Sequence, residues 1–328
     1  ENPDFIENDV LYFLKDYNGI YFPEILAEGK FELEIRGKRV TFLYIIMTLF
    51  GPSLSLLKVL VRRKKFSLFT TTKVAIDMLN CIEIFHSNGY IHNDIKPANF
   101  LVQHNSQSPV VLIDFGLCIK YLTNTPNGTN HIPIEKNLGF TGTLKYASIN
   151  AHNGILLSRR DDLFSWFYSI LELGTGCLPW EKESDYNRSM KMKKNVNKYI
   201  NESIELELIP SEFSLIYQYI SSLRFDEKPN YEAIRGTLRK ALREITKTLK
   251  KKLAETNSDD YAYMRYDWEM IDKESIQVIT SVDIDVPKPA YSYSLFSAEN
   301  DSTNDFVGHE EAIDLSDLVE PGCKCVIN

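Results

Sequence analysis

Apolar residues in the first 50 positions fall into one helical pattern and two strand-like runs. The helical pattern stops at an Asn-Gly pair, which predicts a helix over residues 6–19. Residues 31–35 and 40–47 flank a turn-forming glycine and predict a β-hairpin. The run at 40–50 (VTFLYIIMTLF) is nearly continuous, as in a buried strand. The opening portion is therefore predicted to be a small α+β unit.

Helical periodicity dominates the chain beyond this hairpin. Residues 70–86 carry apolar side chains at helical spacing, and Gly89 follows as a predicted C-terminal cap. The short apolar run at 110–113 predicts a buried strand. Residues 161–173 are apolar on nearly every side, which is typical of a helix inside a large helical domain. Amphipathic helices are predicted to continue through residue 252.

Composition separates a C-terminal tail from the rest of the chain. Residues 255–322 hold 17 acidic and 3 basic side chains, whereas residues 1–254 hold 28 acidic and 33 basic. The tail also lacks periodicity, so residues 255–328 are predicted to be acidic and disordered. Of the 328 residues, 44% are apolar, which is ample for a core. The longest apolar run is too short to cross a bilayer, which takes about 20 residues.

The five cysteines give little support for a metal site. They stand at positions 81, 118, 177, 323 and 325 without paired ligand spacing, which argues against zinc and favours reduced thiols in the cytoplasm. The last four residues, Cys-Val-Ile-Asn, fit a C-a-a-X box. We therefore expect prenylation of Cys325, palmitoylation of Cys323 and anchoring to the cytoplasmic face of a membrane. The alternative is a chance pair of cysteines at a disordered end.

Polar residues of defined types follow the predicted helix at 70–86 and the strand at 110–113. The loop YIHNDIKPANF contains Asp94, Lys96 and Asn99, and the strand leads to Asp114 in the triplet DFG. Asn99 and Asp114 supply oxygen ligands of the kind that Mg²⁺ prefers. Asp94 is suited to accept a hydroxyl proton, and Lys96 to contact a phosphoryl group. Each motif alone also fits an ordinary turn, but their joint order and spacing are those of protein-kinase catalysis.

With these motifs in place, the sequence resembles the casein kinase I superfamily of protein kinases. The resemblance is carried by IHNDIKPANFLV, LIDFGL, GTLKYASINAH, SRRDDLFSWFYSILELGTGCLPW and SLRFDEKPNYEAIR. Ser-Ile-Asn at 148–150 replaces the Ala-Pro-Glu of most kinases, and two segments lean toward the tau-tubulin-kinase branch. The resemblance implies a bilobal α+β kinase domain over residues 1–254, with a small lobe in 1–50 and a mainly helical lobe in 51–254.

The same resemblance implies a monomeric Ser/Thr kinase that transfers the γ-phosphoryl group of ATP to protein substrates with Mg²⁺. Asp94 would be the catalytic base, Lys96 would contact the transferred phosphate, and Thr143 would lie against the catalytic aspartate. Asn99 and Asp114 would hold Mg²⁺. The remaining matched positions are the gatekeeper Met47, the adenine-contacting backbone of Thr48 and Phe50, the helix glutamate Glu7, and the bracing aspartate Asp162.

Two departures from the family pattern bear on activity. Asn93 stands where many kinases have an arginine that pairs with a phosphate on the activation segment, so we expect no such switch. The lysine partner of Glu7 and the Gly-rich phosphate loop should precede Glu7, and the given sequence contains neither. The first residue is Glu rather than Met, so we expect an N-terminally incomplete kinase. A pseudokinase scaffold or a membrane-tethered adaptor is the alternative.

Basic residues outside the catalytic loop suggest a substrate preference. Lys145 matches an arginine with which relatives read acidic or phosphorylated residues, and we expect Lys191, Lys193 and Lys194 to line the same groove. A solvated basic face is the alternative for the last three. The run RRKK at 62–65 fits solvent exposure or a docking role. No nucleic-acid partner is predicted beside so acidic a tail.

Overall fold

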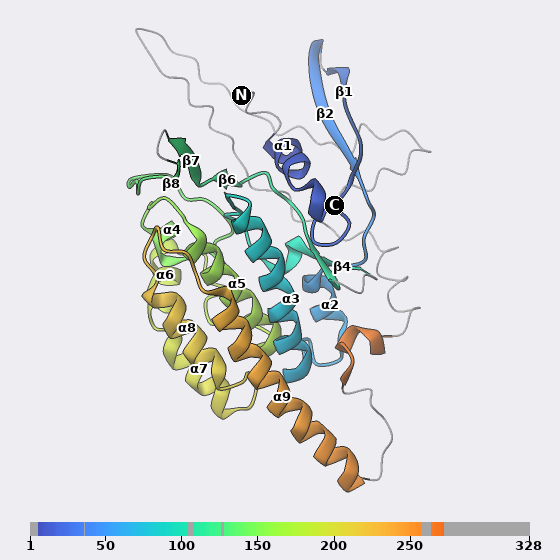
Figure 1. Ribbon diagram of the computed structural model, residues 1–328, viewed down its shortest axis with the longest axis vertical. Helices are drawn as coiled ribbons and strands as arrows, with labels where there is room; N and C mark the ends of the chain where they lie inside the picture. The colour runs from blue at the N-terminus through green and yellow to red at the C-terminus, as the bar shows by residue number, and fades with distance from the viewer. Residues whose placement is uncertain (1–5, 36, 104–107, 126–127, 257–263, 272–328) are drawn as a thin grey trace. The chain divides into compact units, whose positions relative to one another are not determined.

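The computed structural model describes residues 6–35, 37–103, 108–125, 128–256 and 264–271 (Figure 1). An N-terminal β region is followed by a mainly helical region, so the predicted α+β class is confirmed. No described helix has the length and apolar character that a membrane span requires.

The N-terminal region consists of a short helix and a hairpin. α1 (Ile6–Phe13) and the 3-10 turn η2 (Lys15–Tyr17) lead to Gly19, whose φ of +74° suits glycine and ends the helical segment near the predicted position. β1 (Ile25–Ile35) pairs antiparallel with β2 (Lys38–Met47), which confirms the predicted hairpin. The first strand begins six positions earlier than its apolar run indicated.

This hairpin is less buried than its composition indicated. No position of β1 or β2 is buried, and the side chains of Phe31, Leu43 and Ile46 are 44%, 41% and 50% exposed. Within the described residues each of these strands pairs only with the other. A two-stranded sheet cannot bury its own faces without a further layer. The prediction of a buried strand at 40–50 is therefore wrong for the described part of the chain.

Short strands frame two loops in the middle of the chain. β3 (Tyr90–Ile91) pairs with β6 (Ile119–Lys120), and β4 (Phe100–Val102) pairs with β5 (Val110–Leu112). β5 confirms the strand predicted at 110–113, and the turn η3 (Pro97–Asn99) precedes β4. β7 (Leu122–Thr125) and β8 (Gly128–His131) form a further hairpin that the sequence did not predict. Both loops that carry the motifs thus start and end at these small sheets.

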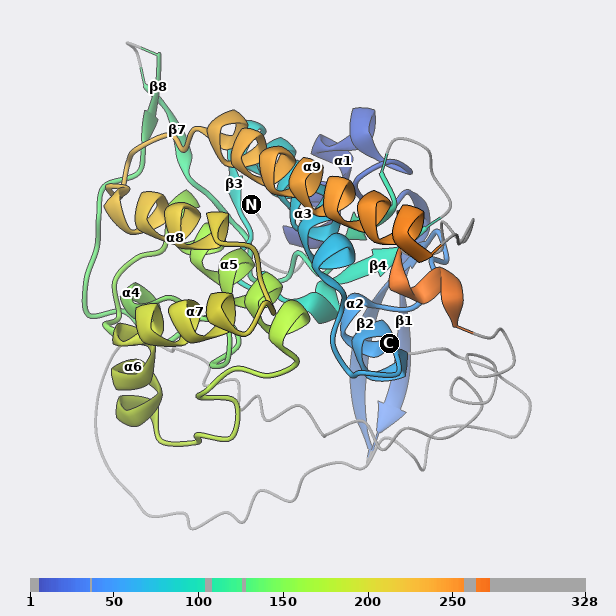
Figure 2. The ribbon, with the colours of Figure 1, turned by 90° about the horizontal axis from the view of Figure 1, so that it is seen from below.

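The helical region packs around a long buried helix. Its helices are α2 (Leu54–Leu60), α3 (Leu68–Ser87), α4 (Ile149–His152), α5 (Arg159–Thr175), α6 (Tyr186–Lys194), α7 (Val196–Glu205), α8 (Glu212–Ser222) and α9 (Tyr231–Thr256). α3 and α5 confirm the helices predicted at 70–86 and 161–173. α3 packs against both α5 and α9, as both ribbon views show (Figure 1, Figure 2). Because α8 and the turn η3 also contact α5, that helix is buried on nearly all sides.

A segment beyond α9 is ordered against the helical region. Residues 264–271, here called the C-terminal clasp, contain the turn η5 (Asp267–Met270). Tyr266 stacks on Trp268 with ring centroids 4.3 Å apart, and its hydroxyl donates to Asp77 Oδ2 of α3 at 2.5 Å. The prediction of a disordered tail from residue 255 is therefore wrong for these eight residues. The helices predicted to continue through residue 252 also extend four residues further, because α9 ends at Thr256.

Candidate active site

Asp162, in the first turn of α5, holds the backbone of the loop after β3. Its Oδ2 accepts from the backbone amide of His92 at 2.8 Å, and its Oδ1 from that of Asn93 at 2.9 Å. His86 Nε2 of α3 lies 2.8 Å from Oδ2. All these groups are buried, so each hydrogen bond replaces one that the group makes to water in the unfolded chain. The bracing contacts that the resemblance implied for Asp162 are thus present.

His92 links this loop to the loop after β5. Its Nε2 lies 3.1 Å from the Ile113 carbonyl, which only accepts, so this nitrogen carries the proton. Nδ1 is then free to accept from the Asp94 amide at 3.3 Å. The ring packs against Phe85 and against Phe115 of the DFG triplet, which is fully buried. The motif histidine therefore positions Asp94 and does not face solvent.

Asp94, Lys96 and Thr143 form one cluster. Thr143 Oγ1 donates to Asp94 Oδ1 at 2.7 Å, and Lys96 Nζ lies 2.5 Å from Asp94 Oδ2. Lys96 Nζ also donates to Thr143 Oγ1 at 3.2 Å. Asp94 is 5% exposed, so its carboxylate is held by these two donors with little contact with solvent. The three residues assigned to catalysis from the sequence are brought together.

Asn99 and Asp114 lie side by side next to this cluster. Asn99 Nδ2 donates to the Asp94 carbonyl at 3.0 Å and lies 3.3 Å from Asp114 Oδ2. Asp114 has a φ of +69°, and its side chain is exposed. An amide and a carboxylate at this separation fit Mg²⁺, which takes few protein oxygens when phosphate and water supply the rest. The described chain has no cluster of three or more His, Cys, Asp or Glu suited to a metal ion.

Asn93 has a structural contact in place of the family arginine. Its side-chain amide donates to the Leu117 carbonyl at 2.9 Å, which ties the catalytic loop to the residue after DFG. Gly142 packs over the same loop with a φ of +91°, and a Cβ there would lie 2.5 Å from the Asn93 carbonyl oxygen. Only glycine allows this approach. Asn93, at the sequence position of the family arginine, therefore makes neutral contacts within the fold.

Asp161 anchors the Ser-Ile-Asn segment and was missed by the sequence reasoning. Its Oδ1 accepts from Ser148 Oγ at 2.7 Å and from Asn150 Nδ2 at 2.8 Å. Its Oδ2 accepts from the Ser158 amide at 2.9 Å and completes a capping box at the start of α5. Burial raises the pKa of Asp161 despite these donors. The signal was available in the Ser158–Asp161 spacing, but it indicated only a helix start.

Lys193 is a buried lysine beneath the backbone of residues 144–147. Its Nζ donates to the carbonyls of Leu144 and Ala147 at 2.6 and 2.7 Å, and lies 3.1 Å from His152 Nε2. Burial lowers the pKa of Lys193 to about 7. The expectation that Lys193 lines a substrate groove is therefore wrong: the side chain is 0% exposed and supports the backbone from inside.

Lys145 is already paired with two carboxylates. Its Nζ lies 3.0 Å from Glu172 Oε1 and makes a second ion pair with Glu181. Glu172 is buried and also binds Lys58 and the Tyr146 hydroxyl. Burial alone would raise the pKa of Glu172, but the hydrogen bonds from Lys58 and Tyr146 outweigh it and lower that pKa. The prediction that Lys145 reads substrate anions conflicts with this pairing.

The predicted hinge, residues 48–50, directly follows the C-terminal end of β2. Met47 is the last residue of β2 and is partly buried. The Thr48 amide donates to the Glu24 carbonyl at 3.1 Å, whereas no hydrogen bond within the described residues involves the Thr48 carbonyl or the Phe50 amide. Those two groups remain available to an adenine ring. Glu7 lies in α1, but the placement of its side chain is outside the description, as are Cys323 and Cys325.

Comparison with family models identifies the class that this geometry indicates. Residues 36–255 match the model of the protein kinase domain. This match covers more than half of the chain, so the protein belongs to the protein kinase family. The matched residues include Asp94, Lys96, Asn99, Asp114 and Thr143. The match therefore covers the whole cluster described above.

Proposed function

We propose that this protein is a Ser/Thr protein kinase of the casein kinase I type, which transfers the γ-phosphoryl group of ATP to protein hydroxyls. The observation that supports it most directly is the contact of Asp94 with Lys96 and Thr143, next to the Asn99–Asp114 pair. Family membership supports phosphoryl transfer. The Ser-Ile-Asn segment and its Asp161 anchor support the casein kinase I type.

In this proposal each residue has a distinct role. Asp94 orients the substrate hydroxyl and accepts its proton, and Thr143 fixes the Asp94 carboxylate for that task. Lys96 places a positive charge beside the substrate hydroxyl oxygen that attacks the γ-phosphate of ATP. There it can contact the transferred phosphoryl group. Asn99 and Asp114 would hold Mg²⁺, which when bound neutralises charge on the ATP phosphates. The free backbone groups of Thr48 and Phe50 would pair with adenine.

The test is transfer of labelled phosphate from [γ-³²P]ATP to dephosphorylated casein by the protein expressed from its complete coding sequence. We expect Asp94→Asn to lower the rate by about 10²-fold or more, because the carboxylate that takes the proton is lost. Glu205→Asn, at an exposed position of α7, is the matched control and should leave the rate unchanged. Transfer by Asp94→Asn equal to that by wild type would contradict the role given to Asp94. No transfer by either protein would overturn the proposal and favour a pseudokinase scaffold.

We also propose that the C-terminal cysteines carry lipid and anchor the protein to the cytoplasmic face of a membrane. The support is the Cys-Val-Ile-Asn ending with Cys323 two positions before Cys325. Cys325→Ser in a fluorescently tagged protein should move it from membranes to the cytosol, because one remaining acyl site cannot give stable binding. An unchanged distribution would exclude prenylation as the anchor.

A further inference from the structure

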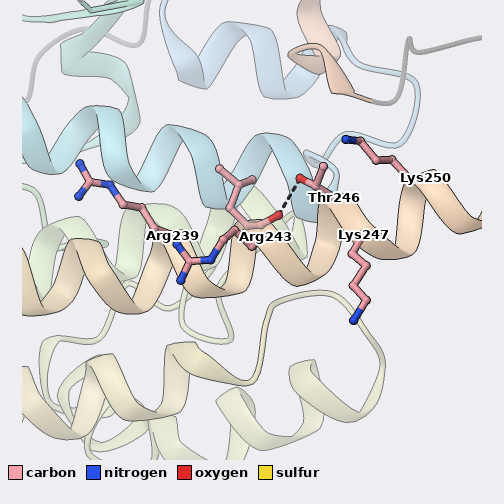
Figure 3. A pocket seen from close by; sticks show the side chains of 6 residues that line it. Arg239, Arg243, Thr246, Lys247 and Lys250 are labelled. Carbon is pink, nitrogen blue, oxygen red and sulfur yellow. Dashed lines mark hydrogen bonds between the residues drawn. The ribbon is translucent and has the colours of Figure 1, made fainter.

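α9 presents a basic face to solvent, most of which has no ion pair within the described residues. Arg239, Arg243, Lys247 and Lys250, here called the α9 basic face, line a groove of about 550 Å³ together with Leu242 and Thr246 (Figure 3). Arg243, Lys247 and Lys250 are exposed and make no ion pair with any described residue. Spaced four and three residues apart, they follow one side of the helix.

The neighbouring cations of α9 are neutralised, which sets this face apart. Arg235 pairs with Glu83 and Glu232, and Lys240 pairs with Glu212. Arg239, at the start of the basic face, pairs with Glu232 at 2.9 Å. Among the described residues, no carboxylate pairs with Arg243, Lys247 or Lys250, so these three side chains carry the charge that the rest of this helix region does not compensate. Partly buried Leu242 adds an apolar strip beside them.

The chain itself contains a segment of complementary charge. Residues 299–320 hold eight Asp or Glu and no Lys or Arg, with apolar residues interspersed. Within it, Glu310, Asp314 and Asp317 repeat the spacing of four and then three. This segment lies outside the described residues, so the comparison is one of sequence and charge.

We propose that residues 299–320 dock on the α9 basic face of the same molecule. The three carboxylates with matching spacing would pair with Arg243, Lys247 and Lys250, while Ile313 and Leu318 would face the strip at Leu242. Multiple pairs in one register bind more strongly than an isolated surface ion pair.

The connection between the two partners is long enough. The 27 residues of 272–298 join the clasp to the acidic segment and, as a flexible chain, span about 30 Å on average. Arg239 to Lys250 covers about 16 Å of helix. A tether of this length gives an effective concentration on the order of millimolar, so weak contacts suffice. Docking would hold the C-terminal Cys323 and Cys325 close to the kinase domain.

Zero-length carbodiimide cross-linking of the full chain tests this pairing, because it joins a lysine to a carboxylate only where they touch. In the monomer band at 50 mM salt, mass spectrometry should find Lys247 and Lys250 joined to Glu310, Asp314 or Asp317. The links should disappear at 0.5 M salt, which screens exposed charges. Exposed Lys136, Lys182 and Lys228 are internal controls. Equal linkage of the tail to these controls, or none to α9, would overturn the proposal.

A charge exchange separates specific pairing from general attraction. Arg243→Glu, Lys247→Glu and Lys250→Glu together should abolish the links. Adding Glu310→Lys, Asp314→Lys and Asp317→Lys should restore them with the partners reversed. Lys136→Glu, Lys182→Glu and Lys228→Glu together are the matched control and should leave the wild-type links intact. Failure of the exchanged protein to regain links would contradict the proposed register.

The rival occupant of this face is an anionic membrane. We expect the unlipidated wild-type chain to bind vesicles of 30% phosphatidylserine and 70% phosphatidylcholine weakly, since the tail covers the cations. Vesicle binding should rise several-fold when Glu310→Gln, Asp314→Asn and Asp317→Asn are combined, because the tail then no longer covers the cations of α9. The opposite outcome is strong vesicle binding by wild type that depends on Arg243, Lys247 and Lys250 and does not change with these tail substitutions. It would identify the membrane as the occupant and overturn the proposal.

Discussion

Thr143 Oγ1 donates a 2.7 Å hydrogen bond to Asp94 Oδ1 and so joins two segments 49 positions apart. Since Lys96 contacts both partners, the threonine hydroxyl completes a triangle that fixes the carboxylate. The orientation of Asp94 thus depends on Thr143, which lies far from it along the chain. Displacement of the backbone at Thr143 would loosen the Asp94 carboxylate.

Thr143→Val should lower phosphoryl transfer while leaving the fold intact, because valine keeps the shape and removes the hydroxyl. Misorientation of Asp94 is expected to lower kcat by about 10- to 100-fold. Thr143→Ser retains the donor and is the matched control, with a rate close to wild type. Both would be measured as steady-state rates on a peptide substrate, with circular dichroism to check folding. A Val variant as active as the Ser variant would show that the hydrogen bond is dispensable.

Asp162→Asn should destabilise the helical region. In wild type, the two carboxylate oxygens of Asp162 accept from the backbone amides of His92 and Asn93. Asparagine replaces one of these oxygens by an NH₂ group, so at least one of the two amides is left buried without an acceptor. The expected loss is about 3 kcal/mol in the free energy of unfolding. Urea unfolding followed by fluorescence measures it, with Glu205→Gln as an exposed control. A loss no larger than that of the control would mean that Asp162 does not support the loop.

Most of the cluster around Asp94 could be predicted from the sequence because four of its members lie in two short motifs. Asp94, Lys96 and Asn99 share one loop, and Asp114 follows the strand β5 that pairs with β4, so short-range order already places them together. Thr143 came from the resemblance alone. Helices α3 and α5 were predicted well because their apolar patterns are long and regular.

What the sequence did not show depends on partners distant along the chain. Lys193 lies in a basic run that resembles a solvated face, and only the approach of Leu144 and Ala147 buries it. Lys145 appeared available because Glu172 and Glu181 are 27 and 36 positions away. The exposure of β1 and β2 was missed for a similar reason. Apolar content predicts a strand, but not whether another layer covers it.

Lys193 gives the free energy of unfolding a dependence on pH. Buried among the rings of Tyr168 and Trp180 and beside His152, the ammonium has a pKa lowered to about 7 from 10.5. Between these two values the unfolded chain binds a proton that the folded chain has released. Stability attributable to Lys193 therefore rises with pH across this window and is lowest below pH 7.

Lys193→Met should remove that dependence. We expect the stability of wild type relative to Lys193→Met to rise by about 2 kcal/mol between pH 7 and 9. Urea unfolding at pH 7, 8 and 9 measures the difference. Lys194→Met, which changes an exposed neighbour, should run parallel to wild type. Parallel curves for wild type and Lys193→Met would show that Lys193 keeps its proton throughout the range.

The C-terminal clasp should stabilise the start of α3. Asp267 accepts from the Ser67 amide and from Ser67 Oγ at 2.5 and 2.8 Å, and its own amide donates to Thr70 Oγ1 at 3.0 Å. A carboxylate at a helix N-terminus satisfies free amides and opposes the helix dipole favourably. Lys73 Nζ lies 3.8 Å from the centroid of the Tyr266 ring, which adds a cation–π contact.

Asp267→Ala and Trp268→Ala should each lower the free energy of unfolding by about 1–2 kcal/mol, through loss of the cap and of the aromatic stack respectively. Glu269→Ala, an exposed change in the same turn, is the matched control. Thermal unfolding measures the loss, and limited proteolysis should cleave near residue 264 faster in the first two variants. Because Asp267 and Trp268 belong to one short segment, the double variant should lose less than the sum of the two. Single variants as stable and as protease-resistant as Glu269→Ala would show that the clasp contributes nothing to the fold.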